Sequence, residues 1–265
     1  MGQHTSRLLK DAVSRGFART ADALLLNPNH GKSGSHLQAL NGDCSPHICY
    51  YHFLCGFSGP ELFWVSARRS IVSFDNILLL HGKGGSPEGS VKDIEALLRA
   101  HYPKKPASSF QRPRLLHADG EILTEQSLAE LQTRDIPKNT VVIGISLGGL
   151  LAAKLQEQGR EDLRIICLNS PTWADAVSLE RRMPDRIAFY SSNDNVIAGR
   201  TQNWPRLATA FDLPWLTHDT SAHAPELAPL IIAYLEGHSI AHAIQQVEER
   251  IAHAERHQQD RAGAS

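Results

Sequence analysis

Four short runs of β-branched and other apolar residues predict strands that are buried on both faces. They are residues 76–80, 140–145, 164–169 and 186–191. Elsewhere, apolar side chains recur at intervals of three and four, the pattern of amphipathic helices. These helices are residues 88–101, 124–134, 148–158 and 224–236. Strands alternating with helices predict an α/β fold, a mostly parallel sheet of about six strands with helices on both faces.

Two weaker strands and one more helix complete this predicted domain at residues 75–237. They lie at residues 113–117, 214–217 and 204–210. Only about sixteen residues separate the strand that ends at Asn169 from the one that begins at Arg186, too few for an inserted cap domain. We therefore expect a shallow, open site that suits small substrates.

A final amphipathic helix is predicted at residues 239–259, inside a C-terminal segment at 238–265 whose end frays. Its narrow apolar stripe consists of Ile240, Ile244, Val247 and Ile251. Such a stripe packs either on the body of the domain or against a second chain, and we favour the first. A monomer or a weak homodimer is the expected state.

Residues 1–74 lack the regular alternation and predict an N-terminal extension with a polar, turn-forming linker at 27–42. Five residues of the types that bind zinc follow this linker. They are Cys44, His47, Cys49, His52 and Cys55. Because they crowd into one segment without two separated ligand pairs, we expect a partly buried, thiol-rich segment and no metal site.

The composition indicates a soluble protein without a nucleic-acid partner. The 265 residues are 42% hydrophobic and 21% charged, with a formal net charge of -1. No apolar run is long enough to span a membrane, and four cysteines make no disulfide framework in a chain of this length. We expect a cytoplasmic location. The basic amphipathic residues at 7–19 also fit a mitochondrial transit peptide, which we do not favour.

The strand at 140–145 leads directly into G-I-S-L-G and then into a helix. Strand, tight turn and helix in this order form a nucleophile elbow, in which glycines around the serine let the backbone fold sharply. The turn holds the Ser146 hydroxyl above the sheet, and the helix N-terminus favours negative charge there. Ser146 is therefore the candidate nucleophile.

Two loops at the carboxyl ends of later strands supply the residue types that such a serine needs. A serine hydroxyl is a poor nucleophile at neutral pH and requires a base within hydrogen-bond reach. His223 is the candidate base, and Asp194 is the carboxylate that holds its ring. His218 competes with His223 for this role, and Asp175 competes with Asp194.

The remaining parts of the predicted site bind the substrate. An oxyanion needs two preorganised donors, for which the backbone N–H groups of Leu147 and Lys83 are the candidates. Gly82 and Trp173 are expected to line the substrate site. The Lys83 side chain is either solvated or available to an acidic substrate.

These motifs resemble those of the α/β-hydrolase superfamily over residues 76–236, especially the small lidless YdeN-like and retinoblastoma-binding serine hydrolases. The matching segments are H-G-K-G-G-S-P at 81–87, G-I-S-L-G-G at 144–149, S-S-N-D-N-V at 191–196 and S-A-H at 221–223. The resemblance implies Ser146 as nucleophile, Asp194 as acid and His223 as base, in the superfamily's chain order. Ala222 is a departure, because members usually have glycine directly before the histidine.

Two functions remain open at this point. The first is a carboxylesterase-like serine hydrolase that cleaves small carboxylic esters or thioesters through an acyl-enzyme, without cofactor or metal. The second is a hydrolase fold kept as an interaction or regulatory module with little or no turnover. We favour the enzyme, because all the residue types of a triad and an oxyanion hole stand in order at strand ends. A serine nucleophile also argues against the dehalogenases and epoxide hydrolases of this fold.

Overall fold

The computed structural model describes residues 73–118 and 121–263. Six strands, all paired in parallel, form one sheet in the order β10-β9-β6-β5-β1-β2. They are β1 (Asn76–Leu80), β2 (Phe110–Gln111), β5 (Thr140–Ile145), β6 (Arg164–Leu168), β9 (Arg186–Tyr190) and β10 (Thr209–Asp212). The predicted fold class is confirmed.

The central strands are apolar at every position because each face of the sheet is covered. Along β6, Ile165 and Cys167 belong to one core, whereas Ile166 and Leu168 belong to the other. This alternation follows from the pleat, which sends successive side chains to opposite faces. A strand with two buried faces therefore shows a continuous apolar run in the sequence, as predicted.

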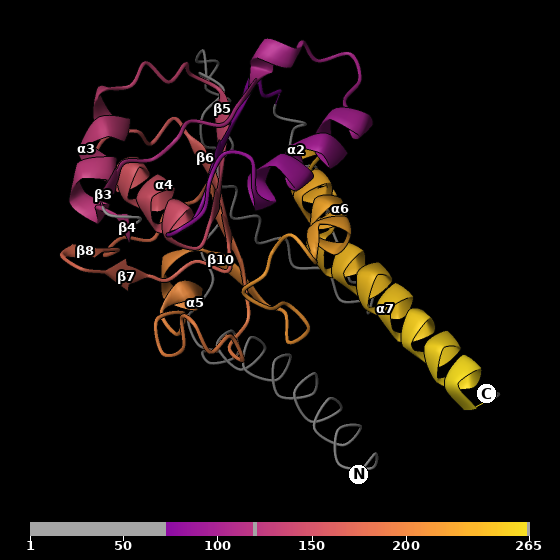
Figure 1. Ribbon diagram of the computed structural model, residues 1–265. Helices are drawn as coiled ribbons and strands as arrows, with labels where there is room; N and C mark the ends of the chain where they lie inside the picture. The colour runs from indigo at the N-terminus through magenta and orange to yellow at the C-terminus, as the bar shows by residue number, and fades with distance from the viewer. Residues whose placement is uncertain (1–72, 119–120, 264–265) are drawn as a thin grey trace, which may run out of the picture. The chain divides into compact units, whose positions relative to one another are not determined.

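Helices cover both faces (Figure 1). The first core takes in side chains of α3 (Thr124–Thr133), α4 (Leu147–Glu157) and the short α5 (Trp204–Leu207). The second takes in side chains of α2 (Ser90–His101), α6 (Ala224–Leu235) and the long C-terminal α7 (Ile240–Gly263). In α7, Ala243 and Val247 are buried in that core. The apolar stripe of α7 therefore packs on the domain.

Short elements complete the described chain. A 3-10 turn, η1 (Ala107–Ser109), precedes β2, and β3 (His117–Ala118) pairs antiparallel with β4 (Glu121–Ile122). Between β6 and β9 the chain forms only the hairpin of β7 (Trp173–Ala174) and β8 (Val177–Ser178). No cap domain is inserted there, as predicted.

Both edge strands lie elsewhere than predicted. Residues 113–117 do not form a strand of the sheet, and β2 lies at Phe110–Gln111. The helix predicted at 204–210 ends at Leu207, and β10 follows at Thr209–Asp212, so residues 214–217 form a turn and loop. β10 is only half-buried and lacks the apolar run of a central strand. The loop after the last strand therefore begins five residues earlier than predicted.

Residues 1–72 lie outside the described residues, and with them the cysteine and histidine segment at 44–55. The division of the chain at residue 75 stays a prediction. Phe74 already packs in the second core, where the Lys105 ammonium lies 4.1 Å from its ring centroid.

Candidate active site

Ser146 occupies a strained turn between β5 and α4. Its backbone has φ 50° and ψ −123°, and a positive φ is a conformation that non-glycine residues rarely adopt. The Ser146 N–H donates to the Leu168 carbonyl at 2.9 Å, which ties the turn to the end of β6. This geometry is that of the predicted nucleophile elbow.

The neighbouring glycines are required by close approaches rather than by flexibility. A Cβ on Gly148 would lie 2.5 Å from the Leu80 carbonyl oxygen, and one on Gly149 would lie 2.0 Å from the Ser170 Oγ. Side chains at these positions would push α4 away from the adjoining strand ends. The two glycines that follow Leu147 are therefore required by the close packing of α4 around the serine turn.

The loop after β1 lies against the same serine. Gly82 packs so closely that a Cβ there would lie 3.0 Å from the Ser146 Cβ and 3.5 Å from its Oγ. The loop forms a turn in which the Gly85 N–H donates to the Gly82 carbonyl at 3.1 Å, with Gly84 at φ +68°. The backbone of Lys83 is part of this turn, whereas its side chain is exposed.

Buried His81 fixes this loop from beneath. Its Nε2 accepts the Leu115 N–H at 3.1 Å, so Nδ1 carries the proton and donates to the Gly82 carbonyl at 2.9 Å. Both ring nitrogens are therefore engaged. His81 acts on the conformation of the loop and is not available as a base.

Asp194, in the loop after β9, is paired with His218. The Oδ2 atom lies 2.8 Å from His218 Nδ1, and Oδ1 accepts the Val196 N–H at 2.8 Å. The carboxylate is fully buried, whereas the His218 side chain is 29% exposed. Because Nδ1 faces the carboxylate, Nε2 is the ring nitrogen left for a reacting partner.

The prediction that His223 is the partner of Asp194 is wrong. His223 Nε2 lies 2.9 Å from the Thr217 Oγ1, and its ring centroid lies 5.7 Å from that of Trp215. It stands at the N-terminus of α6 and lines a hollow of about 580 Å³ that α7 closes from the other side.

The error has a physical cause in the position of β10. His218 is the sixth residue after the end of β10, the spacing that His223 has from the strand predicted at 214–217. The misplaced edge strand therefore shifted the preferred histidine by five positions. Neither histidine follows a glycine, since Thr217 and Ala222 stand before them.

The alternative acid, Asp175, has a different partner. Its Oδ2 accepts the Thr124 hydroxyl at 2.6 Å, which joins the β7–β8 hairpin to the start of α3. Trp173 on the same hairpin is 45% exposed, and the Arg200 guanidinium lies 4.9 Å from its ring centroid. Trp173 is thus an accessible aromatic surface in the segment that follows β6.

Sequence reasoning missed Asn169 altogether. It is the last residue of the run predicted as the strand 164–169, but β6 ends one residue earlier and Asn169 is fully buried at φ 44°. A polar residue directly after a buried apolar run was the available signal. Its side chain joins the loops of Asp194 and His218.

Cys167 is not a competing nucleophile. Burial raises the pKa of its thiol to about 12, although nearby Arg186 opposes the shift. The thiolate is the reactive form, so this cysteine is inert at neutral pH.

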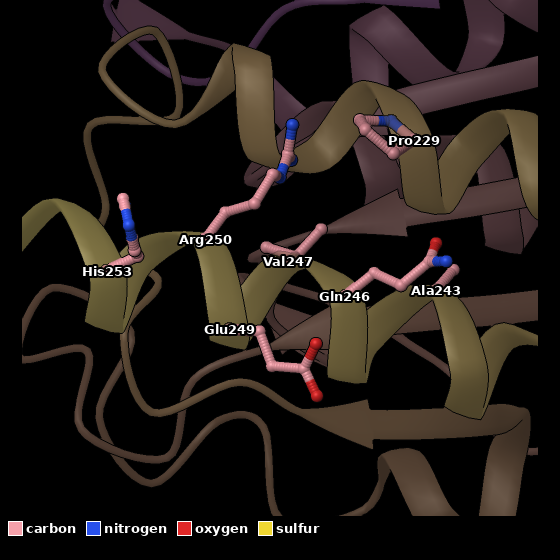
Figure 2. A pocket seen from close by; sticks show the side chains of 7 residues that line it. All are labelled: Pro229, Ala243, Gln246, Val247, Glu249, Arg250 and His253. Carbon is pink, nitrogen blue, oxygen red and sulfur yellow. The ribbon is translucent and has the colours of Figure 1, made fainter.

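A second hollow is lined by none of the predicted site residues. It has a volume of about 660 Å³ and lies between α6 and α7. In Figure 2, Arg250 and Val247 extend from α7 towards α6, whereas Glu249 points away.

Within residues 73–118 and 121–263 no helix is long and apolar enough to cross a membrane. In the same ranges no group of three or more metal-ligating side chains comes together.

Comparisons with known proteins gave structural similarity only. No family model and no curated protein matches the chain. A candidate hydrolase of the alpha/beta superfamily from Xanthomonas campestris pv. campestris is 19% identical, with 61% of this chain and 96% of that chain covered and a TM-score of 0.44. A candidate YdeN-like hydrolase from Pectobacterium atrosepticum is also 19% identical, with coverages of 61% and 90% and a TM-score of 0.43.

A serine hydrolase without a lid from Xanthomonas campestris is 13% identical to this chain. The alignment covers 63% of this chain and 82% of that one, with a TM-score of 0.38. These neighbours are members of the α/β-hydrolase superfamily, the one that the sequence motifs resemble. Similarity at this level assigns no activity.

Proposed function

We propose that the chain is a serine hydrolase that cleaves small carboxylic esters or thioesters. The observation that carries the proposal is the Asp194–His218 hydrogen bond of 2.8 Å, formed by loops that follow the last two strands of the sheet. The elbow that carries Ser146 follows a third strand of the same parallel sheet. Because the carboxyl ends of parallel strands share one edge of the sheet, this topology supports a single site formed by all three groups.

Each group has a defined part in the reaction. The Ser146 Oγ attacks the carbonyl carbon while His218 Nε2 takes its proton, and Asp194 stabilises the resulting imidazolium through Nδ1–H. The carbonyl oxygen becomes an oxyanion, which accepts hydrogen bonds from the backbone N–H groups of Leu147 and Lys83. When the C–O or C–S bond breaks, His218 returns the proton to the leaving alcohol or thiol. His218 then deprotonates a water molecule, which attacks the acyl carbon. The C–O bond to Ser146 breaks, His218 returns the proton to the Ser146 Oγ, and the acid is released.

The buried carboxylate supports this assignment on electrostatic grounds. A fully buried ionised group is costly unless it is hydrogen-bonded, and both oxygens of Asp194 are engaged. The contact with Nδ1 fixes the tautomer in which Nε2 is the base. The exposed side of His218 faces solvent and so can exchange protons with a substrate and water.

The segment between β6 and β9 indicates the size of the substrate. Only the β7–β8 hairpin lies there, with exposed Trp173 on its first strand. An open site with an aromatic rim binds short acyl groups better than long chains that need enclosure. Short acyl esters and thioesters are therefore the substrates to test first.

Labelling with a fluorophosphonate tests the proposal directly. The probe phosphonylates an activated serine, so the purified wild-type chain should gain one adduct by intact mass. Ser146→Ala should gain none, and Ser192→Ala, an exposed serine in the acid loop, should label like the wild type. A folded wild-type chain that forms no adduct, or an adduct that persists in Ser146→Ala, would contradict the proposal.

A further inference from the structure

Leu168, the last residue of β6, and Asn169, the residue after it, together contact all three loops that carry the proposed catalytic groups. The Leu168 carbonyl accepts the Ser146 N–H at 2.9 Å. The Asn169 N–H donates to the Phe189 carbonyl at 2.8 Å, which continues the ladder to β9. The Asn169 side chain makes two further contacts, with Ser191 and Thr217.

The Asn169 amide bridges the acid loop and the histidine loop. Its Oδ1 accepts the Ser191 N–H at 3.0 Å, and its Nδ2 donates to the Thr217 carbonyl at 2.8 Å. Ser191 is itself hydrogen-bonded to Asp194, whose N–H lies 3.3 Å from the Ser191 carbonyl oxygen. Thr217 immediately precedes His218. One amide thus joins the backbones that present both members of the Asp194–His218 pair.

The contacts require both ends of an amide. The Ser191 N–H needs an acceptor, while the Thr217 carbonyl needs a donor, and asparagine supplies one of each. Asparagine also tolerates the left-handed backbone at φ 44° better than most side chains. Because Asn169 is fully buried, removing its side chain leaves the Ser191 N–H and the Thr217 carbonyl without the partners that they have in the folded chain.

We propose that Asn169 is a positioning residue that sets the alignment of His218 with Asp194 and so the rate of acyl transfer. The inference rests on the proposed function. Asn169 acts through the backbone of Ser191 and Thr217 and takes no part in bond making. Its effect is therefore on kcat, with little effect on the KM of a small ester.

Two variants separate the side-chain bonds from the backbone conformation. Asn169→Gly keeps the left-handed backbone available but loses both bonds. Asn169→Asp keeps the volume and the acceptor for Ser191, but it places an oxygen against the Thr217 carbonyl. We expect kcat for p-nitrophenyl acetate and the rate constant of fluorophosphonate labelling to fall about 100-fold in both, as for a misplacement of about 1 Å.

Asn139→Gly is the matched control. Asn139 is another asparagine with a positive φ, 58°, but it is exposed and immediately precedes the start of β5, at the opposite end of the sheet. This variant should keep the kcat of the wild type. Labelling should still reach one adduct per chain in both Asn169 variants, only more slowly, because Ser146 is present in every molecule.

The outcomes distinguish the inference from the function on which it rests. A wild-type chain that does not label defeats the proposed function itself. If the wild type labels and either Asn169 variant labels at the same rate, the positioning role is wrong. It is also wrong if Asn169→Asp fails to fold, or if the loss appears as a smaller labelled fraction at the wild-type rate, since both results indicate a purely structural residue.

Discussion

The two ends of the sheet both bury charged side chains, but in different ways. At the amino end of β9, Arg186 is fully buried and donates to Gln156 Oε1 at 3.0 Å and to the Ala153 carbonyl at 2.9 Å. Its ion pair with Glu157, at 3.3 Å, is also enclosed. In the Asp194–His218 pair at the carboxyl end, the Asp194 side chain is enclosed, whereas that of His218 is 29% exposed.

This difference in exposure indicates which of the two clusters can take part in proton transfer. Burial lowers the pKa of Arg186, and Glu157 opposes that shift, so the guanidinium stays charged and exchanges no proton at neutral pH. The enclosed cluster of Arg186, Gln156 and Glu157 therefore stabilises the fold. The half-open pair combines a fixed carboxylate with a histidine that solvent and substrate can reach, which is what proton transfer requires.

The largest effect is expected at Asp194. Asp194→Asn keeps the shape and the acceptor for the Val196 N–H but loses the charge that fixes the His218 tautomer. We expect kcat to fall about 10⁴-fold with little change in melting temperature. Hydrolysis of p-nitrophenyl acetate measures the first and thermal unfolding the second. Asp175→Asn should keep nearly full activity, and the acid assignment is refuted if it is the inactive variant.

Arg186→Met should lower the stability of the fold and leave kcat unchanged, the reverse of Asp194→Asn. It leaves Glu157 buried without its enclosed partner, which costs about 3 kcal/mol in the free energy of unfolding. The folded variant should keep its kcat, because no catalytic loop contacts Arg186. Urea unfolding and an esterase assay on the same sample test both halves. Loss of kcat at unchanged stability would contradict the contrast between the two ends.

A smaller effect is expected at the rim. Trp173→Ala removes an exposed aromatic surface, so we expect the KM of butyryl esters to rise about tenfold, with less effect on acetyl esters and none on kcat. Steady-state kinetics with acyl chains of two to four carbons measure this. An equal effect on all chain lengths would show that Trp173 does not contact the acyl group.

The smallest effect is the expected lack of alkylation of Cys167 in the folded chain. Since burial holds its pKa near 12, iodoacetamide at pH 8 should leave it unmodified in the folded chain and alkylate it only in urea. Peptide mass spectrometry distinguishes it from Cys44, Cys49 and Cys55. Rapid alkylation of Cys167 in the folded state would show that this part of the core opens.

The sequence predicts those parts of the fold in which burial dictates residue type. The central strands β1, β5, β6 and β9 are enclosed on both faces, so their apolar runs are unambiguous. The edge strands β2 and β10 are short or half-exposed, and each was misplaced. The elbow was predictable because its glycines and serine are adjacent in the chain.

The rest of the site depends on contacts that are distant in sequence. The choice between His218 and His223 turned on where β10 ends, which its residues alone do not show. The bridge from Asn169 to Ser191 and Thr217 spans 22 and 48 positions and leaves no local pattern. The His81 contact with Leu115 is equally non-local, with a separation of 34 residues.

The assignment of His218 as the base is tested most directly by comparing the rate constants of fluorophosphonate labelling of His218→Ala and His223→Ala. We expect His218→Ala to label about 1,000-fold more slowly than the wild type, because the base is gone, and His223→Ala to label at nearly the wild-type rate. The reverse order, with His223→Ala silent and His218→Ala reactive, would contradict this assignment.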